Sequence, residues 1–296
     1  MDLLKDPVGL IWLTGFLGLC VGSFLNVVIH RLPRMLEQGW QHEAGQMLME
    51  QLPEGALRKD LDDWLSKQKP EHINLVTPRS RCPACGHQIG ALENIPVLSY
   101  LFLRGRCKSC KTKISPRYPL IEVLTAALSA AAAWKFGYGL PLAGMLLLIW
   151  SLLALAFIDL DSFLLPDDIT LPLLWTGLIF SHAGGVVTLE EALFGAIAGY
   201  LSLWSVYKLF KLITGKEGMG YGDFKLLAAI GAFLGWKALP AVILLSSVVG
   251  ACVGIGLIVF ARHGRENPIP FGPYLAAAGV LAIFFGEALQ RIFLPL

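Results

Sequence analysis

The chain has 296 residues, of which 55% are hydrophobic and 16% are charged, and its mean hydropathy is +0.61. Soluble domains carry roughly 25% charged residues, so this composition excludes an ordinary soluble protein and indicates one that crosses a membrane several times. The net charge of +2 gives no reason to expect a nucleic-acid partner, because the basic residues lie where membrane topology requires them.

Eight apolar segments are candidates for membrane-spanning helices, since a span needs about 20 mostly apolar residues. They cover residues 8–30, 119–136, 140–158, 168–182, 189–210, 223–236, 238–261 and 271–292, and the sixth of them is short. The expected fold class is therefore an all-α polytopic membrane protein with about eight transmembrane helices embedded in a lipid bilayer.

The spans divide the chain into three regions. Residues 1–30 form the first transmembrane helix, residues 31–118 a polar domain, and residues 119–296 a nearly continuous membrane bundle. Within the polar domain, residues 41–67 are charged with scattered apolar positions. This pattern predicts an amphipathic helical stretch, broken near Pro53–Gly55, that serves as a solvated or interface-lying spacer.

The distribution of basic residues predicts the orientation. If the polar domain is cytoplasmic and eight spans alternate, 20 of the 24 Lys and Arg residues face the cytoplasm. The other four are Lys5, Lys135, Lys237 and Arg291. Cytoplasmic loops of membrane proteins carry an excess of Lys and Arg, so this asymmetry favours a cytoplasmic polar domain.

Four cysteines of the polar domain are spaced as a metal site. Cys82 and Cys85 form one CxxC pair, Cys107 and Cys110 form a second, and 21 residues separate the pairs. Four thiolates in tetrahedral array are the usual ligands of structural zinc, and such a site leaves no open position for catalysis. The alternative is a pair of disulfides, which a reducing cytoplasm disfavours. The other two cysteines, Cys20 and Cys252, lie in apolar runs and are expected to be small buried hydrophobes.

Carboxylates occur in two places at the predicted cytoplasmic ends of spans, and ionisable residues at membrane depth are by default candidates for function. One cluster contains Asp159, Asp161, Asp167 and Asp168, and the other is Asp223. Two carboxylates at one depth from different helices cannot both be ionised cheaply, so they would share a proton and hold a water. Such an acid–base pair could hydrolyse a peptide bond.

Structural roles compete with this interpretation. Asp161, Asp167 and Asp168 fit a loop and a helix start, and Asp223 could equally cap a helix over residues 224–236. The glycines at 218, 220 and 222 favour a catalytic role for Asp223, because glycine lets an extended peptide approach closely and adopts unusual backbone angles. No strand–helix–strand context surrounds these glycines, so a nucleotide phosphate loop is not expected. Lys225 is expected to extend away from Asp223 towards the interface.

Gly220-Tyr221-Gly222-Asp223 matches the GxGD motif of intramembrane aspartyl proteases, and the whole chain resembles the bacterial type IV prepilin peptidases, including those that serve type II secretion. Besides the paired CxxC motifs, the resemblance extends in order through GSFLNVVIHRLP (22–33), NIPVLSYLFLRGRC (94–107), ISPRYPLIEVLTAAL (114–128), FIDLDSFLLPDDITLPLLW (157–175), GMGYGDFKLLAAIGAFLGW (218–236) and PIPFGPYLAAAG (268–279).

The resemblance implies a bifunctional enzyme of the bacterial inner membrane. It would cleave the basic leader from prepilins and pseudopilins on the cytoplasmic side, then N-methylate the new terminal residue, usually Phe, with S-adenosylmethionine. The catalytic pair would be Asp159, seven residues before Pro166-Asp167, and the GxGD residue Asp223. The resemblance also assigns the metal to the four cysteines and methylation to the polar domain, where Gly105 and nearby Glu122 are candidate cofactor contacts.

Three other functions compete with this one. A serine or zinc intramembrane protease is disfavoured because HEAGQ (42–46) is not HExxH, and Gly22-Ser23 is better explained by helix packing. A cation transporter using Asp159 and Asp223 would need them near mid-membrane rather than at one edge. A peptidase without methyltransferase activity is disfavoured by the presence of all four cysteines, which does not exclude it.

Overall fold

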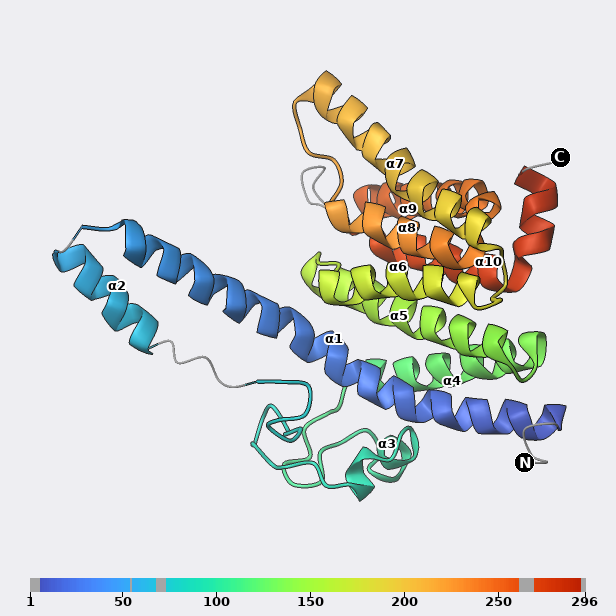
Figure 1. Ribbon diagram of the computed structural model, residues 1–296. Helices are drawn as coiled ribbons and strands as arrows, with labels where there is room; N and C mark the ends of the chain where they lie inside the picture. The colour runs from blue at the N-terminus through green and yellow to red at the C-terminus, as the bar shows by residue number, and fades with distance from the viewer. Residues whose placement is uncertain (1–5, 54, 68–72, 261–268, 294–296) are drawn as a thin grey trace.

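The computed structural model describes residues 6–53, 55–67, 73–260 and 269–293, and all regular structure within these ranges is helical apart from two isolated β-bridges. Each of the eight predicted spans corresponds to one observed helix (Figure 1). These helices are α1 (Pro7–Gln51), α4 (Arg117–Phe136), α5 (Leu140–Ser162), α6 (Asp167–His182), α7 (Leu189–Thr214), α8 (Tyr221–Leu234), α9 (Leu239–Phe260) and α10 (Gly272–Phe293). The all-α multi-pass fold is confirmed.

Six of the helices in the described part of the chain are long and apolar enough to cross a membrane, so the predicted count of about eight is approximate. The two shorter ones are α6, with 16 residues, and α8, with 14. A 14-residue helix rises only about 21 Å, whereas the hydrocarbon core of a bilayer is about 30 Å thick. Helix α8 ends where Gly235 adopts a φ of 76°, and the 3₁₀ turn Trp236–Ala238 separates it from α9.

Helix α1 is longer than its apolar segment. It runs through 45 residues without interruption, so residue 30, the predicted end of the first span, lies inside the helix. Its second half projects beyond the bundle, and the short helix α2 (Ala56–Lys67) folds back beside it (Figure 1). The predicted break near Pro53–Gly55 is confirmed, because the chain leaves α1 after Gln51 and enters α2 at Ala56.

Small residues allow the helices to approach closely. A side chain on Gly22 of α1 would lie 2.7 Å from the Cα of Glu122 on α4, which confirms the predicted packing role of this stretch. On α7 and α8, Gly195 and Gly231 face each other backbone to backbone. As a result α8 is enclosed among its neighbours, and most of its side chains after Asp223 are buried.

The chain direction brings several helix ends to one side of the bundle. Helix α5 ends there, and α6, α8 and α10 begin there, on the side from which α1 projects (Figure 1). Between α2 and α4 the described residues of the polar domain form two short helical elements, the 3₁₀ turn Leu92–Asn94 and α3 (Leu98–Phe102). Polar residues that begin or end these helices are therefore gathered at one face of the membrane bundle.

The close crossing of α7 and α8 yields a stability prediction. Replacing Gly195 by Val forces a side chain into the backbone of Gly231, and such overpacking is expected to lower the free energy of unfolding by about 1–3 kcal/mol. The matched control is Gly256→Val on α9, where a side chain would meet nothing within 4 Å. Thermal unfolding in detergent measures both variants, and equal stability would contradict the close crossing.

Candidate active site and metal centre

Asp159 lies in the last turn of α5 and is 5% exposed. Helix α5 stops because Phe163 adopts a left-handed conformation, and its N–H donates to the Asp159 carbonyl at 2.9 Å. The carboxylate accepts a hydrogen bond of 2.9 Å at Oδ2 from the backbone N–H of Gly272, the first residue of α10. One of the two candidate catalytic carboxylates is thus buried and held by the start of another helix.

Asp223 is the third residue of α8 and is 6% exposed. The cap of this helix is Gly220, which accepts the Asp223 N–H at 3.3 Å, so the alternative that Asp223 caps the helix is wrong. Among the described residues, no group donates a hydrogen bond to its buried Oδ1. A buried oxygen without a partner is costly, so a role other than capping is needed to explain it.

Leu165, in the loop between α5 and α6, connects the surroundings of the two carboxylates. A side chain on Gly222, next to Asp223, would lie 2.6 Å from the Leu165 Cβ. A side chain on Gly272, which binds Asp159, would lie 3.1 Å from the Leu165 Cδ2. The structure therefore brings these two predicted residues together at one end of the bundle.

The other carboxylates of the first cluster have different surroundings. Asp161 forms a two-point ion pair with Arg117 of α4, at 2.7 and 2.8 Å. Asp167, which begins α6, accepts two bonds of 2.7 Å from Lys225 of α8. Lys225 therefore pairs across helices instead of extending freely to the interface. These exposed ion pairs join α4 to α5 and α6 to α8 on either side of the buried carboxylates.

The three glycines before Asp223 differ in what surrounds them. Side chains on Gly218 and Gly222 would lie 2.8 Å from Phe210 and 2.6 Å from Leu165. At Gly220 the nearest atom would be Oδ2 of Asp223, at 3.8 Å, so the backbone there is open beside the carboxylate. None of the three has a positive φ. Close approach accounts for glycine at positions 218 and 222, and an unusual backbone angle accounts for none of the three.

The four predicted metal-binding cysteines come together. Their sulfur atoms all lie within 4.8 Å of one another, with Cys82 and Cys110 at 3.7 Å and Cys85 and Cys107 at 4.0 Å. All four are free thiols, so the disulfide alternative is not what the structure contains. A tetrahedral zinc–thiolate site, with bonds of about 2.3 Å, has sulfur atoms about 3.8 Å apart. The cluster fits one metal ion.

The backbone of the two CxxC turns is alike. The Cys82 N–H donates to the His87 carbonyl at 2.8 Å, and the Cys107 N–H donates to the Thr112 carbonyl at 2.8 Å. Glu93 links the two turns by binding the His87 ring at 3.0 Å and Lys108 at 3.2 Å. The N–H of Gly90 and these two partners hold the pKa of Glu93 below its usual range. Each turn is thus a separate knuckle, and Glu93 cross-links them.

The prediction for the two remaining cysteines is wrong. Cys20 and Cys252 are exposed in the bundle rather than packed inside it. Both belong to helices long and apolar enough to cross a membrane, and lipid covers apolar side chains on the outer surface of such helices.

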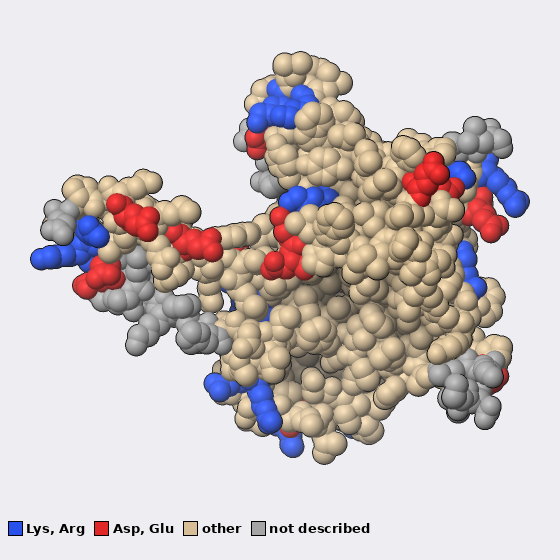
Figure 2. Space-filling view, viewed as in Figure 1, with Lys and Arg blue, Asp and Glu red and all other residues tan. Residues whose placement is uncertain are grey.

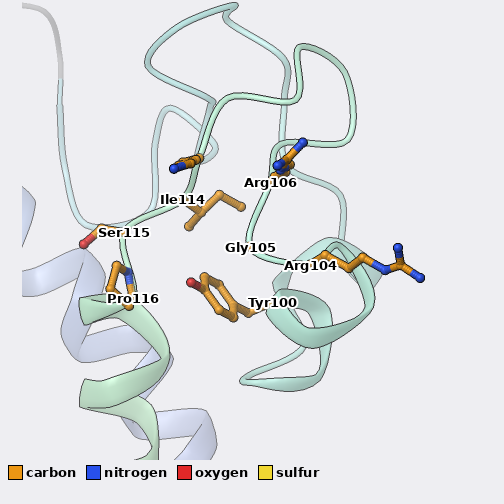
Figure 3. Close-up of a pocket in the computed structure, with 8 residues that line it drawn as sticks. Tyr100, Arg104, Gly105, Arg106, Ile114, Ser115 and Pro116 are labelled. Atoms are coloured by element: carbon orange, nitrogen blue, oxygen red, sulfur yellow. The ribbon is translucent and has the colours of Figure 1, made fainter.

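A pocket of about 460 Å³ adjoins the metal centre and contains Gly105 (Figure 3). The rings of Tyr100 and Pro116 and the side chain of Ile114 converge on it, while the guanidinium of Arg104 extends outwards. The other lining residues are Arg106, Lys113 and Ser115. Gly105 has a φ of 65°, and a side chain there would lie 2.9 Å from the Tyr100 hydroxyl. Only glycine fits this position without strain.

The structure does not bring Glu122 to that pocket. Glu122 is buried on α4, where its Oε2 accepts the N–H of Val97 at 2.7 Å. Val97 immediately precedes α3 and has a φ of 59°, a strained value for a β-branched residue. The carboxylate of Glu122 therefore holds the loop that leads into α3 and the pocket.

Three residues near these sites were missed by sequence reasoning, although each lies in a stretch that carries the family resemblance. Gly272 binds Asp159, and Arg117 binds both Asp161 and the Phe157 carbonyl. Arg31 of α1 donates to the carbonyls of Asn74 and Pro78, at 2.8 and 2.6 Å, and so attaches the segment before the metal centre to the membrane bundle.

Comparisons with known proteins agree with these features. Residues 16–136 match the model of the bacterial peptidase A24 N-terminal domain, and residues 146–255 match the type IV leader peptidase family. No solved structure matches the chain. A prepilin leader peptidase/N-methyltransferase of Aeromonas hydrophila is 56% identical over 296 residues, covering 99% of this chain and 98% of the relative. A protein of the same name from Pseudomonas aeruginosa is 52% identical over 293 residues, covering 99% and 96%. The chain therefore belongs to the type IV leader peptidase family.

Proposed function

We propose that the chain cleaves the leader peptide from prepilins and pseudopilins and then N-methylates the new terminal residue. The observation that carries the peptidase assignment is the pair of buried carboxylates, Asp159 and Asp223, supplied by two helices at one end of the bundle. Relatives that share half or more of their residues with this chain carry both activities in their names.

Peptide hydrolysis needs a base for the attacking water and an acid for the carbonyl oxygen. Two carboxylates that share one proton supply both, because the ionised member accepts a proton from water while the other donates to the carbonyl oxygen. The amide nitrogen is then protonated, the C–N bond breaks, and the proton returns to the pair. In this proposal Asp159 and Asp223 are the two catalytic groups.

The open backbone at Gly220 suits a substrate in extended form. A Cβ at that position would come within 3.8 Å of Asp223 Oδ2 and take up space beside the carboxylate, whereas glycine leaves that space for a peptide. Gly218 and Gly222 keep the loop packed against Phe210 and Leu165. We propose that this loop, Gly218 to Gly222, is where the scissile segment of a prepilin approaches the catalytic pair.

The site is proposed to face the cytoplasm across the bacterial inner membrane, with residues 31–118 as the cytoplasmic domain, residues 1–30 as the first transmembrane helix and residues 119–296 as the peptidase bundle. With this orientation and eight alternating spans, 20 of the 24 Lys and Arg residues would face the cytoplasm, as the excess of basic residues in cytoplasmic loops favours. A prepilin with a basic leader before an apolar helix would present its scissile bond at this depth.

The catalytic pair is tested by Asp159→Asn and Asp223→Asn, made singly. Each substitution removes an ionisable group, so leader cleavage of a prepilin in membranes is expected to fall by about a thousandfold or more. The matched control, Asp168→Asn, changes a neighbouring acidic residue at the start of α6 and should cleave normally. Cleavage at the wild-type rate by Asp159→Asn or by Asp223→Asn would contradict the assignment. If the unsubstituted protein itself cleaves no prepilin, a cation transporter would be the better interpretation.

The four cysteines are proposed to bind one structural zinc ion that folds the polar domain. Four thiolates complete the tetrahedron, so no ligand position remains for water and a direct catalytic role is not expected. The second knuckle lies within residues 105–114, whose two ends line the pocket, and the Ile114 N–H joins these ends by donating to the Gly105 carbonyl at 2.8 Å. Metal binding would therefore shape the pocket.

Metal analysis tests this assignment. The purified protein should contain one zinc per chain, and Cys107→Ser should lose it while Cys252→Ser, outside the cluster, keeps it. Thiolates must be deprotonated to bind zinc, so lowering the pH is expected to release the metal and raising it to restore binding. Zinc retained by Cys107→Ser, or release that does not depend on pH, would contradict a thiolate site.

The pocket beside Gly105 is proposed to hold S-adenosylmethionine. Its volume of about 460 Å³ falls within the 300–1,000 Å³ typical of small-molecule sites, and its lining combines aromatic and cationic side chains. When bound, this cofactor supplies an electrophilic methyl group. The chain has only to hold the new α-amine in line with that group, since an amine with a pKa near 8 is already partly deprotonated. Glu122 would contribute by fixing the loop into α3.

Gly105→Val is expected to separate the two activities. The added side chain would collide with Tyr100 in the pocket, so methylation should fall about tenfold or more while leader cleavage stays within about twofold. Gly90→Ala in the same domain meets nothing within 4 Å and serves as the control. Mass spectrometry of the processed pilin measures both reactions. Normal methylation by Gly105→Val would place the cofactor elsewhere, and a wild-type enzyme that never methylates would be a peptidase alone.

A further inference from the structure

We propose that the first residue of α10 is a positioning element of the peptidase site: the N–H of Gly272 fixes Asp159 as the ionised carboxylate and so leaves the proton of the pair on Asp223. This inference rests on the proposed function, in which both residues are catalytic. It concerns how the two carboxylates divide their roles, which the family assignment does not specify.

The contact between Gly272 and Asp159 is specific. The N–H of Gly272 is 2.9 Å from Oδ2 of Asp159, and both groups are buried. Pro273 follows, and proline has no N–H to offer. The next two N–H groups, of Tyr274 and Leu275, donate to the Phe271 carbonyl at 3.1 and 3.2 Å. Gly272 therefore supplies the donor that faces Asp159 at this end of the helix.

Glycine is required at this position by space. A Cβ on residue 272 would lie 2.6 Å from the Asp159 Oδ2 and 3.2 Å from its Cγ. The carboxylate would have to rotate away and lose the hydrogen bond. The same Cβ would lie 3.1 Å from Leu165, which also packs against Gly222 beside Asp223. Position 272 thus influences both sides of the catalytic pair.

The two carboxylates have unequal hydrogen bonding. Asp159 accepts a full backbone hydrogen bond at the positive, N-terminal end of α10, which runs without interruption until it kinks at Phe285, and both features favour the charged form of Asp159. Asp223 has a buried oxygen, Oδ1, to which no described residue donates. Asp223 also lies in the first turn of a helix, α8, but this position leaves Oδ1 unpaired and so favours the charged form less strongly. The shared proton therefore belongs on Asp223.

Other charged groups near Asp159 do not reverse this difference, because most of them are paired with one another. On α4, α5, α6 and α8 the pairs are Arg117 with Asp161 and Lys225 with Asp167. On α1, His30 lies among Arg31, Arg34 and Asp161. Helix α10 contributes Tyr274, which packs against Gly250. Of these described groups, Asp223 is the one that we take to exchange a proton with Asp159.

This assignment gives each residue a step. Asp159 takes a proton from the water molecule while the water oxygen bonds to the carbonyl carbon of the substrate. At the same time Asp223 gives its proton to the carbonyl oxygen. Asp159 then protonates the amide nitrogen, the C–N bond breaks, and a hydroxyl of the intermediate returns a proton to Asp223. The cycle ends with Asp159 ionised and Asp223 protonated, as it began.

The functional test compares Gly272→Ala with Gly286→Ala, a second glycine of α10 at which a side chain would meet nothing within 4 Å. The added Cβ breaks the hydrogen bond from the residue-272 N–H, which makes Asp159 harder to ionise, so the acidic limb of the kcat/KM profile should move to higher pH. The kcat for leader cleavage should fall about 10- to 100-fold with KM within about twofold. Gly286→Ala should match the wild type.

An unchanged acidic limb in Gly272→Ala would overturn the inference while leaving the proposed function intact, since the wild type would still cleave and Asp159→Asn would not. Infrared spectroscopy at neutral pH tests the proton's position without requiring activity. The carbonyl band of a protonated carboxyl group should vanish in Asp223→Asn and persist in Asp159→Asn. A band that vanishes in Asp159→Asn but persists in Asp223→Asn would overturn the inference, and so would a band that persists in both variants. Neither result depends on whether Gly272→Ala folds.

Discussion

A carboxylate buried in an apolar bundle must be hydrogen-bonded or neutral, and this constraint organises the end of the bundle where α5 finishes and α6, α8 and α10 begin. One carboxylate, Asp159, meets the constraint through the N–H of Gly272. The exposed ion pairs are free of this constraint. Arg117–Asp161 joins α4 to α5, and Lys225–Asp167 joins α8 to α6. As Figure 2 shows, acidic and basic residues gather at the ends and edges of a surface that is otherwise uncharged.

The proposed second activity depends on how the polar domain is attached to the bundle. Glu122 of α4 holds the loop before α3, and Arg31 of α1 holds the segment before the first knuckle. Both contacts lie near the end of the bundle that carries the catalytic carboxylates. A substrate cut at that end would release its new amine close to the domain proposed to methylate it, which gives a physical reason for joining two reactions in one chain.

Apolar runs located all eight bundle helices, and the repeated CxxC spacing located the metal cluster, because both signals are local in sequence. Hydropathy could not foresee that α1 continues to Gln51, since it reports where the apolar segment ends and not where the helix ends, and α1 continues even through Pro33. It also could not foresee that α6 and α8 are shorter than the other bundle helices, or that protein rather than lipid surrounds much of α8. The Gly272–Asp159 contact joins residues 113 positions apart, and no local pattern encodes it.

The central claim is that Asp159 and Asp223 act as a pair within one molecule, and a mixing experiment tests it most directly. Asp159→Asn and Asp223→Asn proteins would be reconstituted together in the same vesicles with a prepilin substrate, and leader cleavage measured. If each site needs both carboxylates from one chain, the mixture should remain as inactive as either variant alone. Cleavage restored by mixing would mean that the two residues act from different chains or in separate sites, and would contradict this account.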